Sequence, residues 1–534
     1  MWLAALLPIL VLLGLIVFFQ WPAYKAAPLS MLTALAVGLV LYKAPPTLIF
    51  FESLKGLWSA LSIILVVFTA ILLFEVTNEA KAFKVFQRGM QRFSPNELMQ
   101  ILLIGWIFTS FLQGITGFGV PVAVGAPLLL GIGVTPLYAV LIPLIGHAWA
   151  NTFGTLGLAW DSLLQTTGIA HGSAQAFETA LWSGCFLWIF NLTAGLVICW
   201  LYGKGEAIRK GLPAVLIISA VQGGGQLFLS NFNYTIAAFI PTTICLLVGM
   251  LLGRTKWYNQ PWRIDNSPCI QRSSAQTDPV LSRAGESKDM SLLQAFVPYI
   301  LLTIITYVCL AVTPVNELLS RWSISLSLPQ TQTGYGVINA ATESYAPLRP
   351  FVHASAFLLL SSLLGYAYYR RRGYANKGCL RKAANRAVKK ALPSACAIMM
   401  LLIMSKIMSG SGQTEVLARG TAAALGRYYA IVAPFIGMLG AFMTSSNMAS
   451  NILFGAFQQT TADVLGLNAF SILGAQTAGG AIGGIISPGN VILGTTTAGI
   501  SGKEGVVLRR TLVIACAIVG FIGVLLLLVS FFIG

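Results

Sequence analysis

Long apolar runs that alternate with short basic or glycine-rich segments are the dominant pattern along this chain. Several runs reach the roughly 20 residues that a helix needs to cross the hydrocarbon core of a membrane. The pattern predicts helices over 3–19, 29–41, 57–76, 98–112, 120–130, 137–158, 179–202, 212–229, 235–253, 293–312, 351–369, 392–409, 431–443, 452–465, 470–486 and 511–533. We therefore expect an all-α, polytopic membrane protein with about 12 or more spans, including broken helices and re-entrant hairpins.

The composition of the chain favours the same class of protein. Of its 534 residues, 56% are hydrophobic and only 9% are charged, and the mean hydropathy is +0.79. Soluble domains carry about 25% charged residues, so the composition excludes soluble enzymes and no enzyme activity is expected. The first apolar run has neither a cationic segment before it nor a cleavage motif of small residues after it. We interpret it as a retained span and not as a signal peptide.

The net charge of +17 raises the question of nucleic acid binding. Of the 33 Lys and Arg residues, 25 fall in five short segments, which are 81–92, 204–210, 254–288, 370–390 and 503–510. Basic segments between spans are typical of cytoplasmic loops, where they set the orientation and contact anionic lipids. The distribution therefore predicts cytoplasmic loops that contact anionic lipids, and it does not predict nucleic acid as a partner.

No cofactor or metal site is expected. The eight cysteines lie in apolar runs or in basic loops without metal-ligand spacing, and His147, His171 and His353 are far apart in the sequence. The chain also lacks a glycine-rich phosphate-binding loop that ends in Gly-Lys-Ser/Thr. Uphill transport by such a protein therefore depends on an ion gradient.

Glycine, proline and small polar residues interrupt the apolar runs at four places, which are 113–121, 151–157, 444–451 and 484–490. Unwound backbone at membrane depth persists only against protein or water. The second pair of interruptions follows the first at an offset of about 333 residues, which indicates an internal repeat. We expect two inverted repeats, with a membrane half over 1–253, a basic cytoplasmic linker over 254–292 and a second membrane half over 293–534.

Paired interruptions of this kind indicate a binding site near the middle of the membrane. Half-helix starts offer backbone N–H groups to a carboxylate, and amides and hydroxyls suit a small polar anion. The candidate substrate-binding residues in the breaks are Gln113, Gly117, Phe118, Gly119, Asn151, Thr155, Ser446, Asn447, Ser450, Asn451, Ser487 and Asn490. The alternative interpretation is close packing of ordinary helices through glycine.

Several of these segments resemble the L-lactate permease family. They are FLQGITGFGVPVA at 111–123, FGTLG at 153–157, the Ser450-Asn451 pair, Ser487-Pro488 and GKE at 502–504. The resemblance covers most of the chain and is strongest over 99–169 and 392–510. It implies a proton-coupled carrier of lactate and other small 2-hydroxy monocarboxylates, such as glycolate, in a bacterial inner membrane.

Four positions depart from the pattern of that family. The family has an acidic residue at the position of Gln113 and an aspartate at that of Asn447. An amide does not titrate near neutral pH, so neither residue can carry a symported proton. Lys406 stands where the resemblance implies a neutral residue, and Asp161 stands where it implies an apolar one. These departures predict altered coupling or a different ligand.

The ionisable residues near or inside the spans are further candidates, because a charge at a helix centre costs about 2.5–3.5 kcal/mol and is usually paired or functional. Glu343 is the first candidate for a titrating acid, Asp161 the second, and His147 a candidate proton relay. Arg349 and Lys406 are candidates for holding the carboxylate. The structural alternatives are a Glu343–Arg349 salt bridge, a loop position for Asp161, a neutral hydrogen-bonded His147 and a Lys406 that reaches the membrane surface.

These observations favour a secondary carrier of a small organic anion, coupled to a proton or sodium ion and working by alternating access. One alternative within transport remains, a permease for a different organic anion with altered or no proton coupling. An anion channel is an alternative of another class. A membrane scaffold or sensor is a third class. A homodimer is one candidate for the oligomeric state of the protein.

Overall fold

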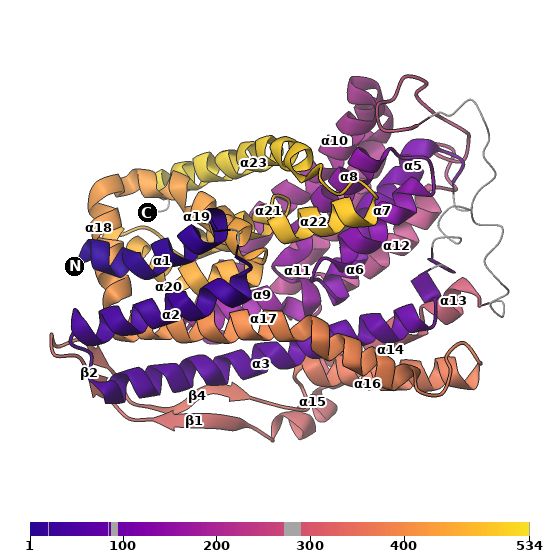
Figure 1. Cartoon of the computed structure of the whole chain (residues 1–534). Coiled ribbons are helices and arrows are strands. Elements are labelled where there is room, and N and C mark those ends of the chain that lie inside the picture. Colours follow the sequence, from indigo (N-terminus) through magenta and orange to yellow (C-terminus); the bar gives the residue numbers. More distant parts are fainter. Residues whose placement is uncertain (20, 84, 87–93, 272–289, 533–534) are drawn as a thin grey trace.

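The computed structural model describes residues 1–19, 21–83, 85–86, 94–271 and 290–532. Most of these residues lie in helices, and Figure 1 shows long helices side by side with a small β-hairpin along one edge. Part of the predicted linker, residues 272–289, and the end of the predicted helix 511–533 lie outside the described residues.

The elements of the first half are α1 (Trp2–Val17), α2 (Ala23–Val40), α3 (Pro46–Glu79), α5 (Glu97–Leu102), the π-helix η1 (Leu103–Phe108), α6 (Thr109–Ile115), α7 (Val120–Leu130), α8 (Pro136–Ala148), the 3-10 helix η2 (Trp149–Asn151), α9 (Gly154–Thr167), α10 (Ala174–Ser219), the π-helix η3 (Ala220–Gly224), α11 (Gly225–Ser230) and α12 (Phe239–Leu252). Those of the second half are α13 (Leu292–Ala295), α14 (Val297–Ala311), α15 (Thr313–Ser320), β1 (Ile324–Leu328), β2 (Thr331–Gln332), β3 (Ile338–Asn339), β4 (Thr342–Leu348), α16 (Ala354–Arg371), α17 (Cys379–Gly410), α18 (Gln413–Leu425), the 3-10 helix η5 (Gly426–Tyr428), α19 (Tyr429–Thr444), α20 (Asn447–Leu465), α21 (Ala469–Gly483), α22 (Pro488–Thr497) and α23 (Glu504–Phe532).

Local sequence explains where many of these helices begin. Pro46, Pro136 and Pro488 are the first residues of α3, α8 and α22, a position at which the missing N–H of proline costs no hydrogen bond. The side chains of Asn96 and Ser446 accept hydrogen bonds from the first turns of α5 and α20. These starts follow from chemistry that is visible in the sequence.

The multi-pass class is confirmed. Within the described residues, 8 helices are long and apolar enough to cross a membrane, or up to 9 if the bent pair α14 and α15 forms one span. Three shorter apolar helices lie over Trp2–Ile16, Val120–Leu130 and Phe239–Leu252. The count of about 12 or more spans and the inverted repeats stay predictions.

The expectation of an all-α chain needs one correction. Strands β1 and β4 pair antiparallel, with Leu326 opposite Tyr345, and β2 pairs with β3 closer to the turn. The sequence Ser-Ile-Ser-Leu-Ser-Leu at 323–328 alternates polar and apolar residues, a period of two that is typical of a strand. The apolar runs predict no element at this segment.

Several helices also differ from the expected ones, and α3 and α17 begin at Pro46 and Cys379, before the predicted starts at 57 and 392. The described chain has a helix, α18, between the predicted helices 392–409 and 431–443. Helix α20 begins at Asn447, so the unwound part of the predicted break 444–451 is only Ser445 and Ser446. The Ser446 hydroxyl caps the helix at the third residue that follows it, Ala449, which moves the start of α20 into the polar segment.

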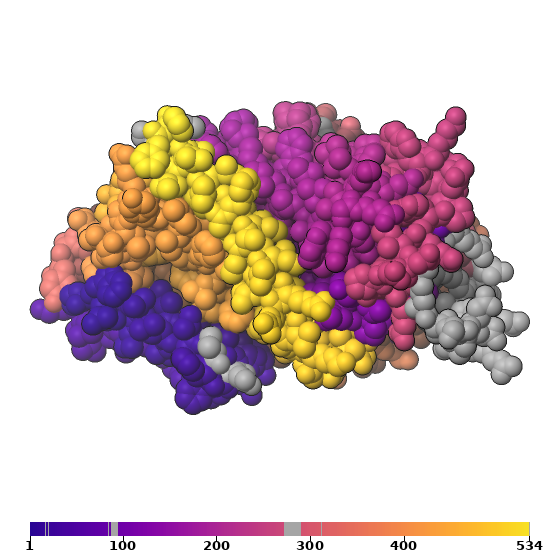
Figure 2. Space-filling model, turned by 90° about the horizontal axis from the view of Figure 1, so that it is seen from above, coloured from indigo at the N-terminus to yellow at the C-terminus, as the bar shows by residue number. Residues whose placement is uncertain are grey.

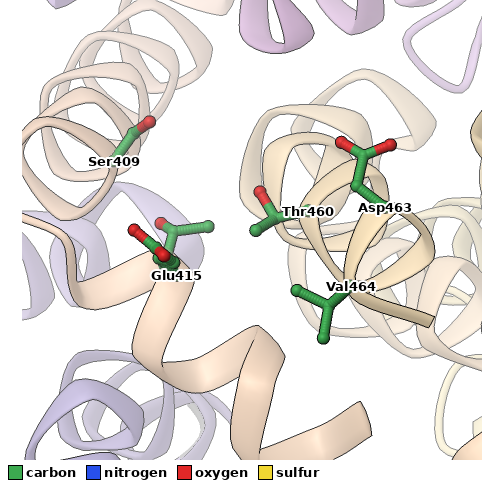
Figure 3. Close-up of a pocket in the computed structure, with 6 residues that line it drawn as sticks. Ser409, Glu415, Thr460, Asp463 and Val464 are labelled. Atoms are coloured by element: carbon green, nitrogen blue, oxygen red, sulfur yellow. The ribbon is translucent and has the colours of Figure 1, made fainter. Parts of the chain in front are cut away.

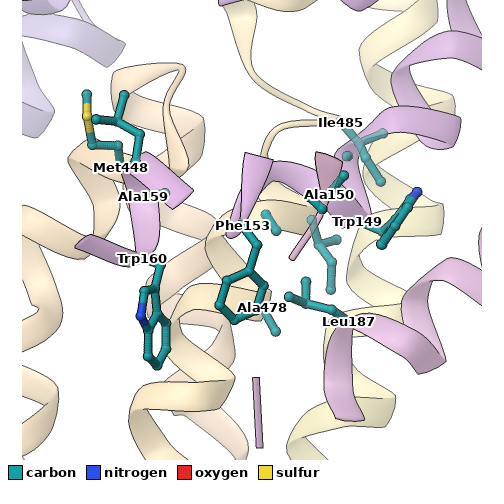
Figure 4. Packing of buried hydrophobic residues seen from close by; sticks show 14 of the residues in the cluster. Trp149, Ala150, Phe153, Ala159, Trp160, Leu187, Met448, Ala478 and Ile485 are labelled. Atoms are coloured by element: carbon teal, nitrogen blue, oxygen red, sulfur yellow. The ribbon is translucent and has the colours of Figure 1, made fainter. Parts of the chain in front are cut away.

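The two halves of the sequence do not form separate bodies. Helix α3 of the first half packs along α17 of the second, and a Cβ added at Gly56 would lie 2.6 Å from the backbone of Ile403. Figure 2 shows α23 as a yellow band that crosses one face of the molecule between the orange and magenta segments. The core therefore contains side chains of both halves, which Figure 4 shows for Trp149, Phe153, Ala478 and Ile485.

Candidate functional site

All four predicted interruptions are present in the structure. The first lies between α6 and α7, where Gly117, Phe118 and Gly119 have φ angles of 56°, 49° and 78°. Glycine adopts this left-handed conformation readily, whereas Phe118 is strained by about 1–3 kcal/mol. None of these three backbone N–H groups donates a hydrogen bond within the described chain. The break therefore presents three successive free donors, which suit an anion.

The second interruption faces the first. Thr155, Leu156 and Gly157 at the start of α9 also have left-handed φ angles, of 50°, 55° and 80°. A Cβ added at Gly117 would lie 2.4 Å from the Thr155 hydroxyl oxygen and 3.4 Å from the Gln113 amide nitrogen. Both breaks and the buried Gln113 amide thus meet at one place, and only glycine fits at position 117.

The third interruption contributes a network of amides and hydroxyls. Asn447 Nδ2 donates to Thr152 Oγ1 at 3.1 Å, and Asn451 Nδ2 donates to Thr477 Oγ1 at 2.9 Å. The Thr152 and Thr477 hydroxyls are themselves 3.1 Å apart. The Oδ1 atoms of Asn447 and Asn451 are buried and have no partner in the described part of the chain. A buried acceptor without a hydrogen bond costs free energy, and a hydroxyl group of a ligand could donate to either of these two oxygens.

The fourth interruption joins the second half to the first. Asn151 Nδ2 donates to the carbonyl oxygen of Ala481 at 3.1 Å, and a Cβ added at Gly119 would lie 3.4 Å from Asn490 Oδ1. The Ser487 hydroxyl and the Asn490 amide both bond to the carbonyl oxygen of Gly484. These hydrogen bonds hold the break in place and leave the N-terminus of α22 beside that of α7.

Some predicted site residues have structural partners. Ser450 Oγ donates to the Gly437 carbonyl oxygen at 2.7 Å, which ties α20 to α19. His147 Nδ1 lies 2.6 Å from the Pro143 carbonyl oxygen, the arrangement expected for a neutral, hydrogen-bonded histidine. Trp149, two residues after His147, is buried in the core and donates to Ser110 Oγ. Phe118 is 37% exposed and is the large side chain that the first break leaves accessible.

The charged candidates lie away from the amide network. Glu343 and Arg349 are exposed, Glu343 on β4 and Arg349 just beyond it, because this segment forms the hairpin that the sequence pattern had not indicated. Lys406 Nζ donates to the carbonyl oxygens of Gln165 and Thr166 near the C-terminal end of α9. The structure therefore does not bring Lys406 or Arg349 to the breaks.

Asp161 follows the second break by one helical turn and accepts a hydrogen bond from Gln165 at 2.7 Å. Its other oxygen lies 2.9 Å from His171 Nε2, in the loop after α9. Burial lowers the pKa of His171, but the hydrogen bond and the charge of Asp161 raise it more, so its pKa lies above the usual 6.5. His171 stacks on Tyr234, which contacts Gly157. This set links the second break to the loop after α9.

Sequence reasoning missed several residues of the interior. Thr152 of the first half and Thr477 of the second accept hydrogen bonds from the amides of Asn447 and Asn451, but a hydroxyl in an apolar run gives little signal of its own. Glu52 and Glu75 are buried in α3 and pair with Lys55 and Lys390. An acid inside the predicted span 57–76 was a usable signal for Glu75, since such charges are rare in membrane helices.

A hollow of about 400 Å³ lies elsewhere, between α17, α18 and α20 (Figure 3). Its lining includes the carboxylates of Glu415 and Asp463 together with Ser409, Thr414 and Thr460. Two acids repel a carboxylate ligand, whereas the breaks offer free N–H donors. We therefore place the candidate anion site at the breaks and not in this hollow.

Free backbone donors and buried amides at paired broken helices, inside a multi-pass helical membrane protein, are features of secondary transporters. The sequence model of the family described as L-lactate permease matches residues 1–533, and the chain belongs to this family. It is 28% identical over 533 residues to the L-lactate permease of Escherichia coli (strain K12), covering 96% of this chain and 93% of that protein.

A second relative carries a different substrate in its name. The glycolate permease GlcA of the same organism is 23% identical over 553 residues, which cover 99% of this chain and 95% of GlcA. Among solved structures, the Alcanivorax borkumensis YdaH transporter aligns with a TM-score of 0.44 at 13% identity, over 88% of this chain and 85% of that one.

Proposed function

We propose that this protein is a secondary transporter of small monocarboxylates, such as L-lactate, glycolate or similar 2-hydroxy acids, in a bacterial inner membrane. Membership of the L-lactate permease family supports the class of substrate. Two observations support the proposed site: three free N–H groups at Gly117–Gly119, and buried Asn447 and Asn451 amide oxygens that have no partner in the described chain. The proposed mode is ion-coupled symport by alternating access.

The arrangement matches the two polar groups of a 2-hydroxy acid. Its carboxylate would bind the N–H groups of the first break, beside Gln113 and Thr155. Its hydroxyl would donate to Asn447 or Asn451 Oδ1, which are acceptors without partners in the described chain. Thr152 bonds to Asn447 and Thr155 lies against Gly117, so the second break links the amides to the first break.

Uptake by purified protein in proteoliposomes tests this function. With a proton or sodium gradient imposed, we expect saturable accumulation of labelled L-lactate or glycolate, and none in empty liposomes. Absence of saturable accumulation under both gradients would refute the proposal. A conductance that rises linearly with concentration would instead indicate an anion channel. Competition by keto acids and sulfonates then defines the substrate class.

The amides at Gln113 and Asn447 favour a second version of this function, a permease with altered or no proton coupling. Gln113→Glu tests it, because the introduced carboxylate would repel the substrate at the N–H groups of the first break until it is protonated. In counterflow with equal pH on both sides, uptake by Gln113→Glu should rise about tenfold as the pH falls from about 7.5 to about 5.5.

Wild type and Gln113→Leu, which have no titrating group at this position, should change much less over the same pH range. Identical pH profiles for wild type and Gln113→Glu would show that position 113 does not face the substrate. A complete loss of uptake by Gln113→Glu at every pH would show that the amide itself is part of the binding site.

A further inference from the structure

Lys406 is a buried cation without a counter-ion. Its residue is 9% exposed, and Nζ donates to two neutral acceptors, the carbonyl oxygens of Gln165 at 2.8 Å and Thr166 at 3.4 Å. Within the described residues, no carboxylate lies within 4 Å of this ammonium group. A charge that is removed from water normally has an ionic partner, so its absence here needs an explanation.

Tyr345 of β4 covers this region. The centre of its ring lies 5.9 Å from Lys406 Nζ and 6.0 Å from Lys55 Nζ, and its hydroxyl lies 3.2 Å from Ser59 Oγ of α3. The ring face stabilises the cations weakly while no anion is bound. The two lysines differ, because Lys55 pairs with Glu52 at 2.6 Å and Lys406 has no such pair.

A residue that bonds to Lys406 also has a polar atom without a partner. Gln165 bonds to Lys406 through its backbone carbonyl and donates its side-chain Nε2 to Asp161 Oδ2 at 2.7 Å. The remaining side-chain atom, Oε1, is buried and has no partner in the described chain. The third ammonium hydrogen of Lys406 can donate to the carboxylate of a 2-hydroxy acid, and Gln165 Oε1 can accept from its hydroxyl group.

The location of this cluster is at the end of the molecule opposite the basic loops. Helix α17 begins among the basic residues of 370–390 and ends at Gly410, one turn after Lys406. The hairpin closes over the same end, where Asn339 donates to the Gly410 carbonyl oxygen at 3.0 Å and Trp58 donates to that of Ala346 at 2.9 Å. Figure 1 shows β1 and β4 lying along α3.

We propose that Lys406 and Gln165 form a second carboxylate subsite, on the approach to the breaks from the face opposite the basic loops, and that Tyr345 is its lid. An entering monocarboxylate supplies the missing counter-ion of Lys406 and displaces the ring of Tyr345. Helix α9 connects this subsite to the second break, since Gln165 lies near its end and Thr155 near its start. This inference rests on the transport function proposed above.

Initial rates of uptake in proteoliposomes test the subsite. Lys406→Gln keeps a donor for the Gln165 carbonyl but removes the charge, and it should raise KM about tenfold or more with Vmax within about threefold of wild type. Lys406→Arg keeps the charge and should recover most of this loss. Tyr345→Leu removes the contact between ring and ammonium and should lower KM about threefold, because less energy is needed to open the subsite.

The matched control is Lys43→Gln. Lys43 is exposed at the same end of the molecule and lies 5.2 Å from the ring of Tyr335 in the same hairpin, so it repeats the lysine–tyrosine contact outside the proposed subsite. Its KM should equal that of wild type. If wild type transports, the subsite is refuted by an unchanged KM for folded Lys406→Gln. It is also refuted if KM rises equally in Lys406→Arg and Lys406→Gln. An unchanged KM for Tyr345→Leu refutes the lid. Failure of wild type to transport refutes the proposed function instead.

Discussion

Asn447→Leu should lower the uptake of labelled L-lactate or glycolate by roughly 5- to 150-fold, equivalent to the about 1–3 kcal/mol of leaving the buried ligand hydroxyl without its acceptor. Its Oδ1 atom is buried and free, and its Nδ2 atom bonds to Thr152 and Thr477. Those two hydroxyls still bond to each other in the variant, so the fold should survive. The measurement is uptake per amount of monodisperse protein in proteoliposomes.

Gln458→Leu is the matched control for this prediction. Gln458 is also a buried amide on α20, but its polar atoms are satisfied by Tyr429, Ala433 and Gln476. Its loss should lower the thermal stability and the yield of folded protein, while the folded fraction keeps the KM of wild type. Equal losses of uptake per folded molecule in both variants would contradict a binding role for Asn447.

Gly479→Ala should strongly reduce the yield of monodisperse, folded protein. A Cβ added at Gly479 would lie 1.9 Å from the Pro434 carbonyl oxygen, and one added at Gly437 would lie 2.1 Å from that of Gln476. Helices α19 and α21 therefore meet backbone to backbone, and they cannot separate without opening the amide network next to them. Overpacking of this kind costs about 1–3 kcal/mol or more. Size-exclusion chromatography and a thermal melt in detergent measure the effect.

Gly505→Ala is the matched control at a helical glycine. A Cβ at this position in the first turn of α23 meets no atom within 4 Å. Alanine is the better helix former by about 1 kcal/mol, so this variant should be as stable as wild type or slightly more stable. A normal melting temperature for Gly479→Ala would show that α19 and α21 can move apart without loss of the fold.

The sequence predicted the positions of the breaks better than their backbone conformation. Glycine and proline act on the backbone locally, so the positions of all four interruptions were visible in the order of residues. The conformation was not visible. Two runs of three successive left-handed residues, which include Phe118, Thr155 and Leu156, lie in turns that contact each other in the folded chain. Likewise, alternation at 323–328 was a local signal for β1, whereas its position over α3 depends on Trp58 and Ser59, far away in the chain.

The sequence by itself determined that this is a multi-pass membrane protein with interrupted helices, because apolar length and helix-breaking residues are properties of short segments. Only the tertiary structure decided which polar groups share a site. It joined Asn447 to Thr152 and left Oδ1 free, and it placed Lys406 and Tyr345 at the hairpin end of the molecule, away from Gln113. The reason is physical. Hydrogen bonds and charges act over a few ångströms, and residues almost 300 positions apart reach that distance only when the helices of both halves pack into one core.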